Sequence, residues 1–196
     1  AQTQNQINDK FRQLNEYLPT ANSYRTASGA PGYAYWQQRA DYKIDVTLDD
    51  DKQTITGKAT IKYYNNSPDP LKYIWMQMDQ NRFDPKTSMD KKSETMPKTT
   101  KGMTMESFRK YVDERTFDGG FKVTSLTDSN GSDLKNVVVG SMMRIDLPEP
   151  LAAGAITEFN ISWWYNIPDA KKYKLSRQGY EFFPRDENRI YEIAQW

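Results

Sequence analysis

Carboxylates are the first side chains in this sequence that could do chemistry. Asp49–Asp51 form an unbroken acidic run, but the run lacks the alternating ligand pattern of a calcium-binding loop. We therefore predict that it is a polar hairpin turn. A glycosidase would need two carboxyl groups about 5–10 Å apart. Four acidic residues near the end of the chain could supply such a pair, although no spacing singles one out: Glu181, Asp186, Glu187 and Glu192.

The sequence contains no histidine and no cysteine. Without imidazole there is no Ser-His-Asp triad, no histidine general base and no HExxH zinc motif. Without cysteine there is no disulfide and no thiolate chemistry. Only chemistry that uses carboxylates alone stays open, and no pair of carboxylates stands out for it. We therefore predict that this chain alone has no catalytic residues, is not an enzyme and binds no metal.

Aromatic residues make up 13% of the chain and could form a surface for stacking on sugars. Trp163 and Trp164 are adjacent in a run that alternates like a strand, so their side chains must point to opposite faces. Trp164 shares the parity of the polar positions, which makes it the better candidate for contact with something outside the domain. The other aromatic residues considered for such a surface are Tyr63, Tyr64, Tyr73, Trp75 and Trp196.

Three predicted strands in residues 41–81 form the part of the chain around which the rest is organised. Apolar and polar residues alternate over Tyr42–Leu48 and again over Ile55–Tyr63, and each run predicts a strand with one buried face. The segment Asn65–Pro70 is rich in residues that break strands, and Leu71–Met78 resumes as a third strand. These runs predict an antiparallel meander on which the following strands should pack.

More short strands are predicted after Gly119, and the clearest is Ile156–Ile167. Prolines and glycine at 148–154 predict a break before it. The other predicted strands cover 121–126, 137–139, 142–147, 180–183 and 189–196. We therefore predict an all-β fold, an antiparallel sandwich that spans residues 33–196.

Two segments of the sequence stand apart from this sandwich. Ile7, Phe11, Leu14 and Leu18 form one helical stripe, so residues 1–32 are predicted to be a short helix and a connector. Residues 84–119 are predicted to be a long insertion loop with about two helical turns near 105–111. Lysines 91, 92, 98 and 101 of this loop could bind an anion, but a solvated loop is the stronger interpretation.

Charge and hydropathy exclude some partners and bear on where the protein acts. The net charge is +1, which provides no basic surface for nucleic acid. No apolar run approaches the ~18 residues that would span a membrane. The start Ala1–Gln4 is typical of a chain from which a signal peptide has been cut, or of a boundary chosen for expression. The chain also stops at Trp196 without a polar tail, which suggests that it was cut from a longer polypeptide.

The run YKIDVTLDDDKQTITGKATIKYYNNSPDPLKYIWMQMDQN, Tyr42–Asn81, resembles the start of the N-terminal domain of aminopeptidase N-like zinc metallopeptidases. The resemblance is greatest to a bacterial branch, through the sequences Leu-Asp, Ile-x-Gly, Asn-Asn-Ser-Pro-Asp and an aromatic residue shortly before Trp75. The closing run IYEIAQW, Ile190–Trp196, is similar to the segment where that domain meets the catalytic domain. The aromatic-Pro-Arg sequence that would follow it there is not in this chain. The resemblance covers most of residues 33–196 and is weaker over 84–119.

The resemblance implies a saddle-like β-sandwich that covers one side of a catalytic domain and forms a wall of the cleft for peptide substrates. In the family, zinc is held by HExxH with a downstream Glu, and a GxMEN-type Glu binds the substrate amine; neither motif is in this sequence. The family also places a glutamine on the last strand of this domain, near the free amino end of the substrate, and Gln195 matches it. The second polar residue of that family pattern would lie beyond Trp196.

We therefore expect a non-catalytic domain of an exported, periplasmic or outer-surface bacterial zinc aminopeptidase, in which the zinc belongs to the catalytic domain. Gln195 would contact substrate, and Trp164 and Trp196 would lie at an interface or contact a ligand. The alternative is a stand-alone β-sandwich that binds a glycan or a protein through exposed aromatic residues.

Overall fold

The computed structural model describes residues 21–86, 104–173, 175 and 177–194. The predicted N-terminal helix and loop residues 87–103 lie outside the described residues. The contacts divide the chain into two compact units, residues 1–38 and 39–196.

The described part of the first unit is a short irregular segment closed by local hydrogen bonds. The side chain of Asn22 accepts hydrogen bonds from the backbone N–H groups of Tyr24 and Arg25, both at 2.9 Å. The guanidinium of Arg25 lies 5.0 Å from the centre of the Tyr35 ring. Such local side-chain acceptors are typical of turns, and the segment belongs to the connector that the sequence predicts.

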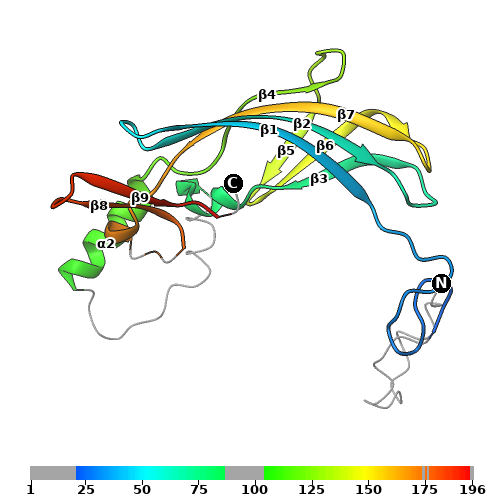
Figure 1. Ribbon diagram of the computed structural model, residues 1–196, viewed down its shortest axis with the longest axis horizontal. Coiled ribbons are helices and arrows are strands. Elements are labelled where there is room, and N and C mark those ends of the chain that lie inside the picture. Colours follow the sequence, from blue (N-terminus) through cyan, green and yellow to red (C-terminus); the bar gives the residue numbers. More distant parts are fainter. Residues whose placement is uncertain (1–20, 87–103, 174, 176, 195–196) are drawn as a thin grey trace. The chain divides into compact units, whose positions relative to one another are not determined.

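The larger sheet of the second unit has four antiparallel strands in the order β1-β2-β7-β4 (Figure 1). These strands are β1 (Arg39–Asp49), β2 (Thr54–Tyr64), β7 (Ile156–Asn166) and β4 (Lys122–Asp128). The prediction of strands at all four places is confirmed. β2 and β7 are central in this sheet, whereas β1 and β4 form its edges.

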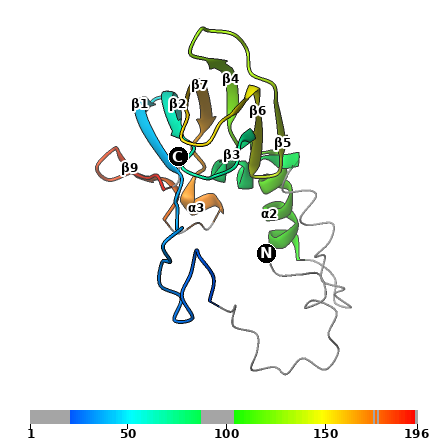
Figure 2. The same ribbon diagram turned by 90° about the vertical axis from the view of Figure 1, so that its right-hand side faces the viewer.

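The smaller sheet has three antiparallel strands in the order β3-β6-β5, and the two sheets form separate layers (Figures 1 and 2). Its strands are β3 (Leu71–Gln77), β6 (Met142–Leu151) and β5 (Asn136–Val139). The predicted break at 148–150 is wrong, because β6 continues through both prolines. The pairing of β3 with β6 is irregular there, and β5 pairs only as far as Ile145. Prolines are tolerated at such positions because no regular ladder needs their missing N–H groups.

The fold is therefore an all-β antiparallel sandwich, as the sequence predicts. Beside the sheets lie the 3-10 helix η3 (Asp79–Phe83) and the helices α2 (Met105–Thr116) and α3 (Ala170–Tyr173). A hairpin of β8 (Gly179–Phe183) and β9 (Asn188–Glu192) ends the described chain. α2 is longer than the two turns that the sequence predicts. None of the helices in the described part of the chain is long and apolar enough to cross a membrane.

The core lies between the two sheets. The predicted alternation on β7 is confirmed, because Phe159, Ile161, Trp163 and Tyr165 are all buried. Gly57 lies opposite Trp163 in the pairing of β2 with β7. A Cβ atom on Gly57 would lie 2.4 Å from Cζ2 of the indole, so only glycine leaves room for this ring. The other sheet contributes buried residues that include Ile74, Met78, Met143 and Ile145.

The predicted buried face of β1 is wrong. Its apolar residues Tyr42, Ile44, Val46 and Leu48 lie on one face, but each is between 40% and 61% exposed. β1 is an edge strand of the larger sheet, and the described structure leaves its apolar face partly open. The alternation of β1 therefore identifies an apolar face that this sandwich covers only in part.

A buried asparagine joins the two connections at one end of the sandwich. The Nδ2 group of Asn65 donates to the backbone carbonyls of Asp69 at 2.8 Å, Leu151 at 3.0 Å and Ala152 at 3.1 Å. Its Oδ1 atom accepts from the N–H of Ser67 at 3.1 Å and from the hydroxyl of Ser67 at 2.6 Å. Asn65 is 0% exposed, so its bonds replace those that water would otherwise provide. This asparagine ties the β2–β3 connection to the β6–β7 connection.

Candidate functional site

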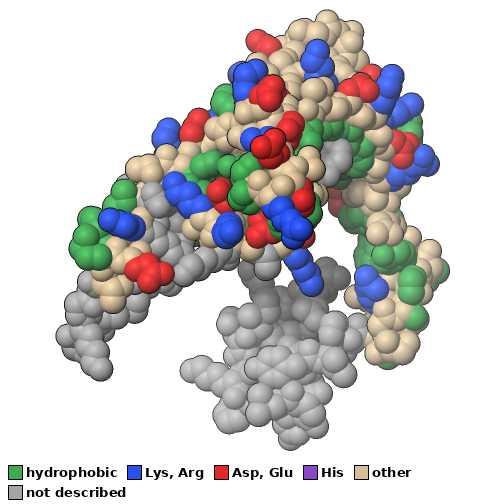
Figure 3. Space-filling model, turned by 60° about the vertical axis from the view of Figure 1, so that its left-hand side comes forward, with side chains coloured by type: hydrophobic (Ala, Val, Ile, Leu, Met, Phe, Trp, Pro, Cys, Tyr) green, Lys and Arg blue, Asp and Glu red, His purple; other side chains and the backbone are tan. Residues whose placement is uncertain are grey.

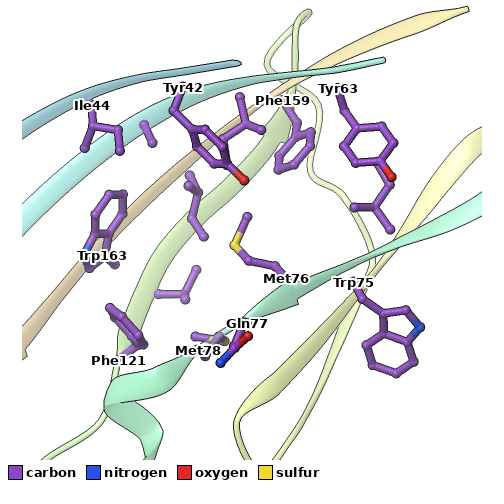
Figure 4. A pocket seen from close by; sticks show the side chains of 15 residues that line it. Tyr42, Ile44, Tyr63, Trp75, Met76, Gln77, Met78, Phe121, Phe159 and Trp163 are labelled. Atoms are coloured by element: carbon purple, nitrogen blue, oxygen red, sulfur yellow. The ribbon is translucent and has the colours of Figure 1, made fainter. Parts of the chain in front are cut away.

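A hollow of about 350 Å³ lies between the two sheets on the side of β1. Tyr42, Met76 and Phe159 point into it, whereas Trp75 lies on the other side of β3 (Figure 4). Its lining is mostly apolar, includes the polar side chains of Tyr42, Tyr63 and Gln77, and contains no charged side chain. Such a hollow can accept apolar groups and offers a few polar groups for hydrogen bonds.

The described residues contain no group of three or more Asp or Glu side chains that could hold a metal ion. The sequence contains no histidine or cysteine to complete such a group. The residues of this chain therefore do not fit a zinc site, because protein zinc sites rely on imidazole and thiolate ligands.

Charged side chains of both signs are interspersed on the face shown in Figure 3 rather than gathered by sign.

The acidic residues considered above lie on the surface. Asp49 begins a turn, as predicted, and its Oδ1 accepts from the N–H groups of Asp51 at 3.1 Å and Lys52 at 3.0 Å. The four acidic residues considered for a glycosidase pair are all exposed. Exposure leaves their charged form well solvated, so the sandwich does not provide the desolvated general acid that such a pair requires.

The chain just before Gln195 is held by two buried glutamines. Nε2 of Gln80 and Nε2 of Gln178 both donate to the backbone carbonyl of Ala194, each at 3.2 Å. Gln80 is 3% exposed and Gln178 is 6% exposed. Gln80 lies in η3 and Gln178 lies just before β8, so two distant segments converge on one carbonyl. We call Gln80, Gln178 and this carbonyl the glutamine clamp.

Strand β9 of the hairpin is tied to the turn between β1 and β2. The hydroxyl of Tyr191 donates to Oδ1 of Asp50 at 2.6 Å, and Nη1 of Arg189 lies 3.1 Å from the other oxygen of that carboxylate. Burial, followed by the hydrogen bond to Asp50, raises the pKa of Tyr191 to about 12. The phenol therefore stays neutral over the physiological range and can donate to the carboxylate. These contacts fix β9 relative to β1 and β2.

Of the three residues predicted to make contacts, only Trp164 is described. It lies on β7 opposite Thr56 of β2 and Lys122 of β4, and it is partly buried. Gln195 and Trp196 lie outside the described residues.

The most exposed aromatic pair on the sheets is Tyr73 and Trp75, at 46% and 51%. Their rings meet edge to face, with centroids 6.1 Å apart, and the Arg144 guanidinium lies 5.2 Å from the Tyr73 ring centre. Sequence reasoning considered this pair only within a larger aromatic set.

Sequence reasoning also missed the glutamine clamp. Gln80 and Gln178 lie in irregular segments, where no periodic pattern distinguishes a buried polar residue from an exposed one. The only local signal is that Gln80 and Asn81 directly follow an apolar strand. Asn81 is buried as well, and its side chain donates to the carbonyl of Gly140 at 3.0 Å and accepts from the N–H of Phe121 at 2.9 Å.

No family model matches the sequence, and no curated protein matches it. Among solved structures the chain is similar to an M1 zinc metallopeptidase from Deinococcus radiodurans, with 12% identity over 83% of this chain and 31% of that one, at a TM-score of 0.42. A mutant of that protein matches with 12% identity over 79% of this chain and 28% of the mutant chain, at a TM-score of 0.42. The mutant bound to a Tyr-Ser-Ala substrate matches with 12% identity over 71% of this chain and 23% of the mutant chain, at a TM-score of 0.41. The chain therefore spans less than a third of these structures, which are zinc metallopeptidases like the family that its sequence resembles.

Proposed function

We propose that this chain is the non-catalytic N-terminal domain of a zinc aminopeptidase-like metallopeptidase. It packs on the catalytic domain of the same polypeptide and forms one wall of the cleft that binds peptide substrates. The zinc belongs to the catalytic domain, since this chain has neither histidine nor cysteine. We also propose that the protein is exported, which detection of the mature chain in a periplasmic or surface fraction would test.

The glutamine clamp is the observation that carries the proposal. A residue that meets the charged amino end of a substrate must be held in a defined place, because a loosely held group loses most of its binding energy. The clamp holds the carbonyl of Ala194, which is the residue directly before Gln195. The amide oxygen of Gln195 can then accept a hydrogen bond from an ammonium group.

The first test is the sequence of the gene downstream of the Trp196 codon. We expect an HExxH motif within the next few hundred codons, and a stop codon directly after Trp196 would overturn the proposal. The purified chain should not hydrolyse aminoacyl anilides with or without added zinc. Zinc-dependent turnover by this chain alone would also contradict the proposal.

The second test concerns the role of Gln195 in the full-length enzyme. Gln195→Ala should raise KM for substrates with a free amino end by roughly tenfold, because one hydrogen bond to a charged group is lost. Gln195→Glu keeps an acceptor and should retain most of the affinity. If Gln195→Ala and Gln195→Glu give the same KM as the natural enzyme, Gln195 does not contact the substrate.

The exposed pair Tyr73 and Trp75 favours a second candidate function, a stand-alone module that binds glycans. Exposed aromatic rings are the usual stacking surfaces for sugars. Calorimetric titration with oligosaccharides would detect this activity. Loss of binding in Trp75→Ala, with retention in the partly buried Trp164→Ala, would locate it on the outer face of β3. The reverse result would locate it on β7, as the sequence suggests.

A further inference from the structure

β1 is a long edge strand with an open side. All eleven of its residues pair with β2 in an uninterrupted register, from Arg39 opposite Tyr64 to Asp49 opposite Thr54. No strand in the described part of residues 39–196 pairs with its other side. Natural edge strands are usually protected by proline, a bulge, short length or charged side chains. β1 has no proline or bulge and is eleven residues long, and its charged side chains are of both signs, so it presents a continuous row of backbone donors and acceptors.

The apolar face of this strand is also incompletely covered. Tyr42, Ile44, Val46 and Leu48 remain between 40% and 61% exposed, as described above. An additional strand beside β1 would place new side chains next to this face, because paired strands bring opposite residues within about 5 Å of each other. A partner for the open edge would therefore bury apolar area and satisfy backbone groups together.

We propose that the open edge of β1 pairs with β1 of a second copy of this chain, antiparallel and centred on Ile44. The two four-stranded sheets then become one continuous sheet across a two-fold axis. This proposal goes beyond the function proposed above and does not depend on it, since it uses only β1.

The charges of β1 identify both the partner and the register. With Ile44 opposite its copy, Lys43 faces Asp45 of the second copy, and the two-fold axis repeats this pair. At the strand ends, Arg39 faces Asp49 of the second copy. Each charged residue then faces either an opposite charge or, for Asp41, the neutral Thr47. Opposite charges across a strand pair stabilise it, and like charges destabilise it.

The neighbouring registers are disfavoured. A shift of one residue would place polar side chains of one copy on the apolar face of the other. Centring the pair on Asp45 sets Asp45 against its own copy and Asp41 against Asp49. Centring it on Lys43 sets Lys43 against its own copy and Asp41 against Asp45. The register centred on Ile44 is also the one that uses the full length of β1, because Ile44 is the middle residue of Arg39–Asp49.

The central charged residues are available for this pairing. The ion pairs of β1 in the structure are Arg39 with Asp41 and Asp49 with Lys52, at the two ends of the strand. No ion pair in the described chain involves Lys43 or Asp45, and both are exposed. Since one strand edge is a small interface, we expect a weak dimer that dissociates at roughly 10–100 µM.

Sedimentation equilibrium of the chain tests the proposal, with loading from about 5 µM to about 500 µM to bracket that range. We expect a monomer–dimer equilibrium. Lys43→Glu alone should weaken the dimer on the order of tenfold, because two copies of a like-charge contact replace two attractive ones. Asp45→Lys alone should weaken it to a similar extent. Lys135→Glu, an equal charge change at an exposed site away from β1, should leave the equilibrium unchanged.

Two experiments in which dimerisation is restored make the test specific to this register. The double variant Lys43→Glu with Asp45→Lys should dimerise like the natural chain, because each contact is attractive again with its signs exchanged. An equimolar mixture of the two single variants should form a heterodimer, because Glu at 43 and Asp45 of one chain then face Lys at 45 and Lys43 of the other. Circular dichroism melting shows that each variant is folded. The proposal would be overturned if the chain stayed monomeric at all concentrations. It would also be overturned if all the charge variants had the same dissociation constant as the natural chain.

Discussion

Replacement of Asn65 by alanine should destabilise the sandwich more than most single substitutions. The side chain makes hydrogen bonds to both connections, with donor–acceptor distances between 2.6 and 3.1 Å, and the residue is fully buried. Its two amide hydrogens and its oxygen amount to about four bonds, each worth about 1 kcal/mol net. The Ser67 hydroxyl also lies 3.0 Å from the carbonyl of Asp69 and can donate there once Asn65 is gone, which offsets a part of the loss.

We therefore expect Asn65→Ala to lower the free energy of unfolding by about 3–4 kcal/mol. For a unit of this size, that corresponds to a fall in Tm of roughly 6–16 °C. Urea unfolding followed by tryptophan fluorescence measures the free energy, and calorimetry measures Tm. Asn130→Ala is the matched control, because Asn130 is exposed in a turn, and it should change stability by less than about 0.5 kcal/mol.

Asn65→Asp separates the donor role of this residue from its acceptor role. Aspartate keeps the acceptor for Ser67, but at neutral pH it cannot donate to the carbonyls of Leu151 and Ala152. It also places a charge in a buried site among carbonyl oxygens, which is unfavourable. We expect Asn65→Asp to be at least as unstable as Asn65→Ala near neutral pH. If Asn65→Asp is nearly as stable as the natural chain, the donated bonds do not hold the two connections together.

Three further predictions concern the core and the hairpin. Gly57→Ala should lower the free energy of unfolding by about 1–3 kcal/mol through overpacking against Trp163. In a chain that already carries Trp163→Phe, Gly57→Ala should cost less, and urea unfolding midpoints of the four chains measure this difference. Tyr165→Phe should leave stability unchanged or raise it, because the buried hydroxyl has no hydrogen-bond partner among the described residues; a loss above about 1 kcal/mol in thermal unfolding would contradict this. Folding raises the pKa of Tyr191 to about 12, so its bond to Asp50 contributes fully below the unfolded pKa of about 10 and is lost as pH rises towards 12. The stability difference between the natural chain and Tyr191→Phe should therefore shrink between about pH 10 and about pH 12, and a constant difference would refute the linkage.

Period-two patterns made most of the strands predictable, but not whether each strand is covered. β7 and β1 have the same alternation in the sequence, yet Phe159 of β7 is 2% exposed and Tyr42 of β1 is 61% exposed. The alternation depends on the residues of one strand, whereas burial depends on which strand of the other sheet lies opposite. Strand order is a property of the whole chain, so the position of β1 at an edge could not be predicted from its own residues.

Polar residues that are buried through distant contacts were the least predictable part. Asn65 was interpreted only as a breaker, since its partners Leu151 and Ala152 lie more than 80 residues away in the sequence. Gln80 and Gln178 show the same limit, because they lie far apart in the sequence and meet at the carbonyl of Ala194. A side-chain amide can form hydrogen bonds with the backbone of any loop that folds against it. The sequence alone does not identify which loop that is.

The position of the β8–β9 hairpin follows from polar contacts as well as from apolar packing. Tyr180 and Tyr191 are partly buried and pack against the core, but within β8 and β9 only Gly179 is fully buried. The carboxylate of Asp50 contacts both Arg189 and Tyr191 of β9, and the glutamine clamp holds the chain just after this strand. Hydrogen bonds are directional, so these two ties restrict both the place and the direction of a short strand. The turn between β1 and β2 and the helix η3 therefore both hold the chain as far as Ala194, the residue before the proposed substrate contact Gln195.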